Sequence, residues 1–506
     1  MSDKFLHGAE VIEIDAGPRP IQTVRSSVIG IIGTAPNAQA EVKARLLTGV
    51  VANNNALTFT SKLLGALGNQ ITVNLRAPVG NNLPLAITVA GQAITVDLAT
   101  GAGGAVSTTA TQLTTAIAGH AAANALIGVT NTGTSTGVGI VAATPGAQFL
   151  AGGIDEAFPL NTPVLIAGSR AEAAKLGTAG TLPDAIESIF DQAGAVVVVV
   201  RVADGGTEPL TTANVIGGTN ATTGQFEGVH AFRAAESVVG FSPRILIAPG
   251  FTHQRAGSAN AVVAELIGIA ERLRAVIIAD GPNSTDAAAI TYAGDFGSSR
   301  VFVVDPWVTK LDANGQPVNV PVSPHVAGVI AKSDNDRGFW WSPSNTTING
   351  IIGTARGVDM VLGDAHSRAN LLNERKVATI IRQEGFRLWG NRSLASDPKW
   401  AFLSVRRTAD IINDSILRAH LWAVDRNITK TYLEDVTESV NAYLRDLTSL
   451  GAILGGRCWA DPDLNTPAQI AQGNVFFNFS FTPPYPAEHI TFRSHLVNDY
   501  LTELLD

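Results

Sequence analysis

The feature that most constrains the fold is a series of short apolar runs that alternate with helical patterns between residues 160 and about 305. The run "AVVVVVRV" is apolar up to Arg201, which is typical of a strand covered on both faces. Similar runs are "PVLIAG", "SPRILIAPG", "AVIIAD" and "SRVFVVDPW", separated by helical stretches such as "LPDAIESIFDQAG" and "ANAVVAELIGIAERLR". This alternation predicts a mainly parallel, doubly wound α/β sheet with helices on both sides.

The composition changes sharply from about residue 50 to residue 153. Charged residues are almost absent there, and Thr, Val and Ile strands are separated by Asn and Gly turns. The stretch "STTATQLTTAIAGHAAANAL" predicts one helix that starts near Ser107. We therefore expect residues 50–153 to form an inserted β-rich domain, and residues 25–49 and 154–360 to form the α/β domain.

The rest of the chain predicts a mixed α+β C-terminal domain at residues 361–487. The stretch "SRANLLNERKVATIIRQEGFRLWG" predicts one helix that ends at Gly390. A strand leading into a helix is expected in "WAFLSVRRTADIINDSILRAHLWAV", and a further helix in "LEDVTESVNAYLRDLTSLGAI". The stretch "NVFFNFSFTP" alternates phenylalanine with polar residues, as a half-buried strand does.

Both ends of the chain predict extended arms that project from the compact body, at residues 1–24 and 488–506. A strand this short cannot stand alone, so each arm needs a sheet to join. The residues expected to pair as arm strands are Val11, Ile12, Glu13, Ile14, Ile490, Thr491, Phe492 and Leu496. Glycine and prolines next to these strands suit hinges, namely Gly17, Pro18, Pro20, Pro483, Pro484 and Pro486.

Bulk properties exclude several classes of protein. The net charge is −8 and no Lys- or Arg-rich stretch occurs, so we expect no direct contact with nucleic acid. Cys458 is the only cysteine, and the nine histidines show no H-x-x-x-H spacing, so neither a disulfide nor a metal site is expected. No apolar run approaches the roughly 20 residues of a membrane segment, and the charged N-terminus predicts synthesis in a cytoplasm.

The string "SPHVAGVIA", Ser323–Ala331, raises the question of catalysis, since a similar string follows the catalytic serine of subtilisin-like proteases. Val320 stands where the nucleophile would be, and valine has neither a proton to give nor a lone pair to attack with. The "HGTH" string that supplies the general base is absent, and His325 belongs to the shared string itself. The chain is therefore not expected to be a protease of this type.

Acid–base chemistry has weaker support. Asp280, Asp295 and Asp305 lie near strand or helix ends in the α/β region, where paired carboxylates could exchange protons. Turn and capping roles are commoner for aspartates at such positions. We expect no enzyme activity and no cofactor.

Four strings together closely resemble contractile phage tail sheath proteins: "FLHGAEVIEIDAGPRPIQTVRSSVIGIIGTAP", "SPHVAGVIAKSDNDRGFWWSPSNTTINGIIGTAR", "LWGNRSLASDPKWAFLSVRR" and "FTPPYPAEHITF". The resemblance covers about residues 1–48 and 155–506. It implies a middle domain related to the subtilisin scaffold without its catalytic residues. It also implies a structural subunit of the virion, assembled in the host cytoplasm.

The resemblance further implies stacked hexameric rings around a rigid tail tube, with the C-terminal domain against the tube. Arms would add strands to the sheets of neighbouring subunits, and a baseplate would trigger contraction that drives the tube through the host envelope. Implied partners are the chain itself, the tube, the baseplate and the tail terminator. Tube contact is expected on the helix that carries Asn373, Glu374, Arg375 and Lys376, although these residues suit a solvated face almost as well.

Two other functions stay open at this point. The same subunit could belong to a headless contractile bacteriocin or a related injection machine, which the genes beside it would decide. An α/β hydrolase-type enzyme is the third hypothesis, and it needs a nucleophile or metal cluster that the sequence does not offer.

Overall fold

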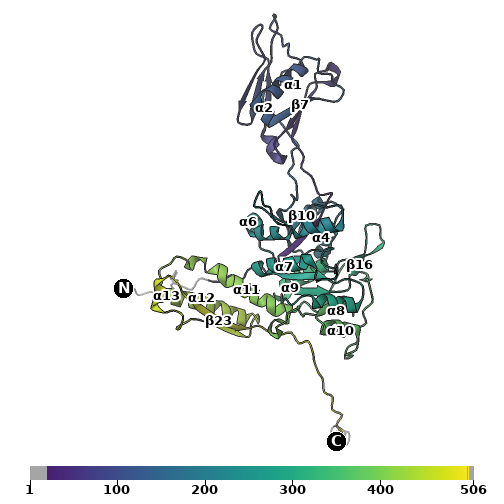
Figure 1. Ribbon diagram of the computed structural model, residues 1–506. Coiled ribbons are helices and arrows are strands. Elements are labelled where there is room, and N and C mark those ends of the chain that lie inside the picture. The colour runs from purple at the N-terminus through teal and green to yellow at the C-terminus, as the bar shows by residue number, and fades with distance from the viewer. Residues whose placement is uncertain (1–19, 499, 501–506) are drawn as a thin grey trace, which may run out of the picture. The chain divides into compact units, whose positions relative to one another are not determined.

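The computed structural model describes residues 20–498 and residue 500. The chain forms two compact units (Figure 1). The first unit holds residues up to 34, residues 161–173 and residues from 181 onward, and the second holds residues 35–160 and 174–180. Each unit is built around its own apolar core.

The first unit is organised by a nine-stranded sheet with the order β18-β21-β20-β15-β14-β13-β1-β10-β9. The six strands from β20 to β10 run parallel, and β9, β21 and β18 are antiparallel to their neighbours. In chain order the strands are β1 (Ile29–Thr34), β9 (Pro163–Ala167), β10 (Val196–Val202), β13 (Ile245–Ile247), β14 (Val276–Asp280), β15 (Val301–Val304), β18 (Thr346–Thr347), β20 (Val377–Arg382) and β21 (Phe386–Trp389). The prediction of a mainly parallel α/β sheet is confirmed.

Helices cover both faces of this sheet. Helices α4 and α9 pack together against β1, β13 and β14, whereas α5 to α8 share a different apolar cluster with the sheet. The helices are α3 (Arg170–Ala173), α4 (Leu182–Phe190), α5 (Glu208–Ile216), α6 (Ala235–Val239), α7 (Ala261–Leu273), α8 (Asp286–Gly294), α9 (Ser323–Arg337) and α10 (Arg368–Glu374). Small sheets on the periphery contain β11 (Gly218–Thr219) with β12 (Phe226–Glu227), and β16 (Val308–Leu311) with β17 (Pro317–Val320) and β19 (Gly353–Thr354).

A C-terminal lobe, which we define as α11, α12, α13 and the hairpin β22–β23, completes the first unit. Its elements are α11 (Leu403–Ala419), α12 (Lys430–Ser449), β22 (Gly455–Ala460), α13 (Pro467–Ala471) and β23 (Phe477–Thr482). The predicted alternation in β23 is confirmed, because Phe477, Phe479 and Phe481 all pack against the apolar cluster shared by α11 and α12.

One helix prediction and one strand prediction in this region are wrong. Residues 367–390 form α10 followed by the antiparallel pair β20–β21, not one helix. The chain turns at Lys376, which has a φ of 64°, and the β-branched run that follows is buried beside β15. That burial outweighs the helical pattern of the stretch. The strand expected before α11 is reduced to an isolated bridge between Arg392 and Phe402.

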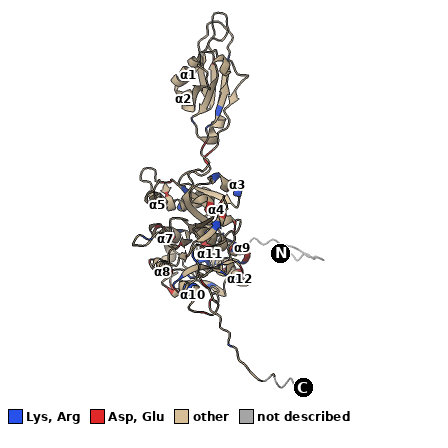
Figure 2. Cartoon of the chain, turned by 90° about the vertical axis from the view of Figure 1, so that its right-hand side faces the viewer, with Lys and Arg blue, Asp and Glu red and all other residues tan. Residues whose placement is uncertain are grey.

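The second unit contains two small sheets and two helices. One sheet has the order β2-β3-β7 and the other β5-β6-β4-β8. The elements are β2 (Arg45–Thr48), β3 (Leu57–Ser61), β4 (Thr72–Arg76), β5 (Ala86–Ala90), β6 (Ala93–Asp97), α1 (Ala110–Gly119), α2 (Ala121–Leu126), β7 (Ile127–Asn131) and β8 (Gln148–Phe149). Figure 2 shows how few charged residues this unit carries around α1 and α2.

The helix predicted near Ser107 begins at Ala110. The reason is a capping box, in which the Thr109 hydroxyl accepts the backbone N–H of Gln112 and the Gln112 side chain accepts that of Thr109. Strand β2 lies before residue 50, so the compact unit starts earlier in the chain than the insert that the composition delimits.

Candidate functional site

The "SPHVAG" string lies at the start of α9, where Ser323 is the first residue of the helix. Its hydroxyl donates to Oδ2 of Asp280 at 2.7 Å, and its backbone N–H donates to Oδ1 at 2.7 Å. The Thr252 hydroxyl also donates to Asp280 at 3.2 Å. All three residues are fully buried. The serine therefore fastens α9 to the carboxyl end of β14, and its hydroxyl faces the protein interior.

Electrostatics at this point fit a structural role for the string. Burial raises the pKa of Asp280 to about 6, against the opposing effect of the hydrogen bonds from Ser323 and Thr252. Burial and the nearby charge of Lys310 lower the pKa of His325 to about 4, so its ring is neutral at pH 7. Val320 ends β17.

The raised pKa of Asp280 predicts a specific pH dependence. An unfolded aspartate has a pKa near 3.9, so the native state binds more protons than the unfolded state between about pH 4 and 6. This contribution to stability is fully present below about pH 4 and is lost as the pH rises to 6. The loss is on the order of 3 kcal/mol for two pKa units. Urea unfolding of the wild type against Asp280→Asn should therefore favour the wild type increasingly as the pH falls. A constant difference between the two proteins would contradict this assignment.

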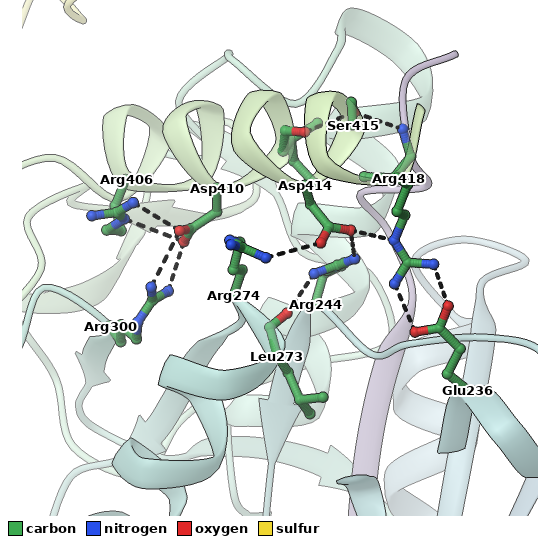
Figure 3. A network of polar contacts seen from close by, with 12 residues as sticks. Glu236, Arg244, Leu273, Arg274, Arg300, Arg406, Asp410, Asp414, Ser415 and Arg418 are labelled. Carbon is green, nitrogen blue, oxygen red and sulfur yellow. Dashed lines mark hydrogen bonds and ion pairs between the residues drawn. The ribbon is translucent and has the colours of Figure 1, made fainter. Parts of the chain in front are cut away.

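An extended polar network lies where α11 crosses the amino ends of three neighbouring parallel strands (Figure 3). Arg244 immediately precedes β13, Arg274 lies two residues before β14, and Arg300 immediately precedes β15. Because the amino ends of parallel strands meet at one edge of the sheet, these three arginines lie along that edge. Two aspartates of α11 face them, Asp410 and Asp414, which are four residues apart and so share one side of the helix. We call this set the α11 charge ladder.

One half of the α11 charge ladder is centred on Asp410. The Arg300 guanidinium binds both carboxylate oxygens, at 2.7 and 3.2 Å, and Arg406 binds them at 2.7 and 3.2 Å. Arg300 also lies 2.9 Å from Glu271. The side chains of Arg300 and Asp410 are only 6% and 3% exposed, so this pair has left water almost completely.

The other half is centred on Asp414, which binds three arginines. Arg274 lies at 3.1 Å and Arg418 at 2.6 Å, and the buried Arg244 donates to the same carboxylate. Arg418 continues outward to Glu236 of α6, with Nη2 at 2.7 Å from the carboxylate. The α11 charge ladder therefore joins the C-terminal lobe to the central sheet from the interior to the surface.

The described N-terminal segment runs across the same helix. The backbone N–H of Val24 donates to the Ser415 hydroxyl at 3.0 Å, and the hydroxyl of Thr23 lies 3.0 Å from that of Tyr443 in α12. Arg407 pairs with the buried Asp334 of α9 and donates to the carbonyl of Ser26 at 3.2 Å. The N-terminal segment is thus attached to the C-terminal lobe before it enters β1.

Buried ion pairs of this kind act on orientation more than on net stability. Desolvating the charges costs about as much as their attraction returns, whereas the bidentate geometry tolerates few relative positions of the two partners. An apolar contact would allow α11 to slide along the sheet edge. The α11 charge ladder therefore holds the lobe and the sheet in one register.

The hairpin β22–β23 offers one free sheet edge. The side chain of Asn441 accepts the N–H of Cys458 at 2.7 Å and donates to its carbonyl at 3.1 Å, so these backbone groups point away from β23. Phe479 is the register partner of Cys458, and its own backbone groups therefore point away from β22. Within residues 20–498, no strand pairs with that outer edge of β23. A surface pocket spans both strands of the hairpin and is lined by Leu454–Arg457 and Ser480–Thr482.

The predicted arm residues fall partly within the described chain. Ile490, Phe492 and Leu496 are 65%, 90% and 98% exposed, and these residues and Thr491 have no regular secondary structure. Pro20, Pro483, Pro484 and Pro486 lie in non-regular backbone. The residues that lie outside the described part are Val11, Ile12, Glu13, Ile14, Gly17 and Pro18. Strand pairing by either arm stays a prediction.

The residues considered for tube contact lie at the end of α10. The Asn373 side chain donates to the carbonyls of Ala369 and Trp389, and Lys376 donates to the carbonyl of Ala395 at 2.6 Å. Glu374 and Arg375 are exposed. Two of the four side chains are therefore engaged within the subunit, and tube contact by this segment stays a prediction.

The α11 charge ladder was not predicted, although the sequence carries a signal for it. Arginine stands one or two positions before three successive apolar runs, in "SPRILI", "LRAVII" and "SSRVFV". The helix contains two aspartates at a spacing of four in "RRTADIINDSILR". Together these patterns predict a row of cations at one sheet edge and two anions on one helix face.

Among the described residues, no group of three or more His, Cys, Asp or Glu side chains is arranged to hold a metal ion. No helix in the same part of the chain is long and apolar enough to cross a membrane.

Comparison with known proteins gives consistent matches. Family models match for the phage tail sheath protein central domain at residues 224–394, the phage tail sheath C-terminal domain at residues 395–496, and the domain III N-terminal region of the tail sheath protein Gp18 at residues 136–202. A prophage major tail sheath protein of Pseudomonas aeruginosa (strain UCBPP-PA14) is 46% identical over 364 residues, covering 72% of this chain and 91% of that protein. The tail sheath protein of Burkholderia phage BcepMu is 30% identical over 536 residues, covering 100% of this chain and 99% of that protein.

A solved structure shares the fold. The sheath complex of an extracellular contractile injection system, PVC, in its contracted state matches with a TM-score of 0.52 and 18% identity. The match covers 68% of this chain and 89% of that chain. The two matched sheath domains adjoin between residues 394 and 395, so the α11 charge ladder joins arginines of the first matched domain to aspartates of the second.

Proposed function

This chain belongs to the family of contractile phage tail sheath proteins, and we propose that its subunits stack as hexameric rings around a tail tube and shorten to drive that tube through the host envelope. The observation that carries this proposal is the sequence identity to tail sheath proteins, which with the BcepMu protein extends over the whole chain. The subunit is a structural part of a contractile tail. The tube, baseplate and terminator are proposed as its partners, and the sleeve is proposed to assemble in the host cytoplasm.

The proposed mechanism needs links between subunits that survive a large change in packing. We assign these links to the two arms, and the receiving site to the outer edge of β23. An arm that adds as a strand satisfies its own backbone groups and those of Phe477, Phe479 and Phe481, with little demand on side chains. The exposed apolar residues Ile490, Phe492 and Leu496 support this role, since their burial against a neighbour would add to the hydrogen bonds.

The work of contraction is proposed to come from packing and not from a bound nucleotide. A contracted sleeve that buries more surface than the extended one lies lower in free energy. We propose that the central domain lacks catalysis, which is supported by the full burial of Ser323 and Asp280. The likeness of this domain to a subtilisin scaffold remains part of the proposal, as do the domain boundaries at 24, 49, 153, 360 and 487.

A truncation tests the arm proposal. Deleting residues 1–19 removes the proposed N-terminal strand but leaves β1 and the contacts of Thr23 and Val24 with the lobe. We expect a folded subunit with wild-type thermal unfolding that no longer forms long tubes in negative-stain electron microscopy. Deleting residues 86–97, which form β5 and β6, would not be an equivalent control, because it removes part of the core of the second unit. A truncated chain that fails to fold would show that the arm belongs to its own subunit.

The alternative function is that the same sheath subunit belongs to a headless contractile bacteriocin or a related injection machine. It is supported at the level of fold by the likeness to the sheath of an extracellular contractile injection system. Capsid and portal genes beside the coding sequence, or filled heads on purified particles, would favour a phage.

A further inference from the structure

In the described part of the chain, the C-terminal arm contacts the body close to the start of α11. Arg392 and Phe402 face each other in an isolated antiparallel bridge. Nε of Arg392 lies 2.8 and 3.0 Å from the two carboxylate oxygens of Glu488, and Nη2 donates to the same group. The arm residue Glu488 is therefore paired with the body in a bidentate manner.

Aromatic contacts extend this attachment. The Arg392 guanidinium lies 5.2 Å from the centre of the Phe402 ring, and the ring of Tyr485 meets Phe402 edge-on with centres 6.2 Å apart. The order of contacts is Tyr485, Phe402, Arg392, Glu488, and we call these four residues the arm clasp. Among residues 489–498, no hydrogen bond or ion pair reaches the body, and the polar contact found there joins His489 to Thr491.

We propose that the arm clasp fixes the direction in which the C-terminal arm leaves the subunit, so that the exchanged segment begins at His489 and not at the proline hinge. This proposal rests on the proposed exchange of arms between subunits. The prolines at 483, 484 and 486 lie between the end of β23 at Thr482 and the paired Glu488, so both ends of their segment are attached to the body. Motion around them would have to break the contacts of Glu488 or Tyr485.

The arm clasp also places the two arm exits at different parts of one helix. Phe402 directly precedes α11, whereas the N-terminal segment binds Ser415 near its other end. The α11 charge ladder fixes the same helix to the central sheet. Each clasp contact is weak alone, because Arg392 and Glu488 are 37% and 40% exposed. Together they orient the arm in a free subunit and can still open when subunits reorient.

A distance measurement on the free subunit tests the arm clasp without requiring assembly. Spin labels are placed at two exposed positions, Leu496→Cys in the arm and Leu417→Cys on α11. Burial raises the pKa of the native Cys458 thiol to about 11, so it stays largely unlabelled. Double electron–electron resonance on dilute, monomeric protein then gives the distribution of arm directions.

The expected result is a narrow distance distribution that broadens at least twofold in Arg392→Glu and in Glu488→Arg. The exchange of both residues, Arg392→Glu with Glu488→Arg, should narrow it again, because the ion pair is restored. Arg445→Glu, which breaks the exposed pair with Glu438, is the matched control and should leave the width unchanged. Equal widths in all variants would overturn the arm clasp. Tube formation is scored separately by electron microscopy, so a wild type that never polymerises would count against arm exchange and not against the clasp.

Discussion

Asp414→Ala is expected to destabilise the first unit by about 3–5 kcal/mol, the usual cost of removing one partner from a buried ion pair. The loss is large because the variant leaves Arg244, which is 5% exposed, without its carboxylate and leaves Arg274 and Arg418 facing it. Three cations would then share one site with no anion between them. All seven tryptophans lie in the first unit, so their fluorescence during urea unfolding reports this unit alone.

The matched control is Glu236→Gln, which removes the other carboxylate that binds Arg418. Glu236 is 51% exposed, so we expect this variant to lose less than about 1 kcal/mol. If both substitutions have the same small effect, the α11 charge ladder is solvated in solution and does not hold the lobe. A large loss in Asp414→Ala alone would establish that the buried carboxylate of Asp414 holds the C-terminal lobe to the central sheet.

The parts of the fold that could be predicted from the sequence are those whose structure follows from a local pattern of residues. Strands such as β10 and β14 were predictable because each is a short apolar run between turn residues. A run of this kind is typical of a strand that is buried on both faces of a sheet. The stretch 367–390 was not predictable, because its residues suit a helix locally and only pairing with β15 decides for β20. Most strands of the central sheet therefore follow from the local sequence pattern, whereas β20 forms because of its pairing with a strand that is distant in the sequence.

The candidate sites also differ in whether they depend on a local string or on residues that are far apart in the sequence. The prediction that the chain lacks a subtilisin-type triad rests on Val320 and on the absent "HGTH" string, and both are local features of the sequence. The ladder needs Arg244, Arg300 and Asp414 together, and these residues are separated by up to 170 positions. The arm clasp is harder still to predict from the sequence, because Arg392 and Glu488 belong to no motif. They are 96 positions apart and come together only in the folded chain.

Phe479→Pro is expected to abolish tube formation, or to raise the concentration needed for it roughly tenfold or more, relative to Phe479→Ala. Proline lacks an N–H, and the N–H of Phe479 points away from β22, so the hairpin keeps its own ladder. The hydrogen bond that is lost is the one offered to an added strand, and the proline ring also obstructs that strand's approach. The alanine variant loses the same packing of the phenylalanine ring but keeps the N–H, so the difference between the two isolates the edge.

Phe479→Pro and Phe479→Ala can be compared in assembly only if both are folded monomers at low concentration. Tryptophan fluorescence and sedimentation should report folded monomers at low concentration for each, and electron microscopy then scores tubes as the concentration rises. Equal assembly of the two variants would mean that arms do not pair with this edge, and the edges β9 and β18 of the central sheet would become the receiving sites to test. Assembly by the alanine variant alone would place the subunit link on backbone hydrogen bonds at β23. Such a link depends little on side chains, which is the property that lets one joint persist while the bodies around it change their packing.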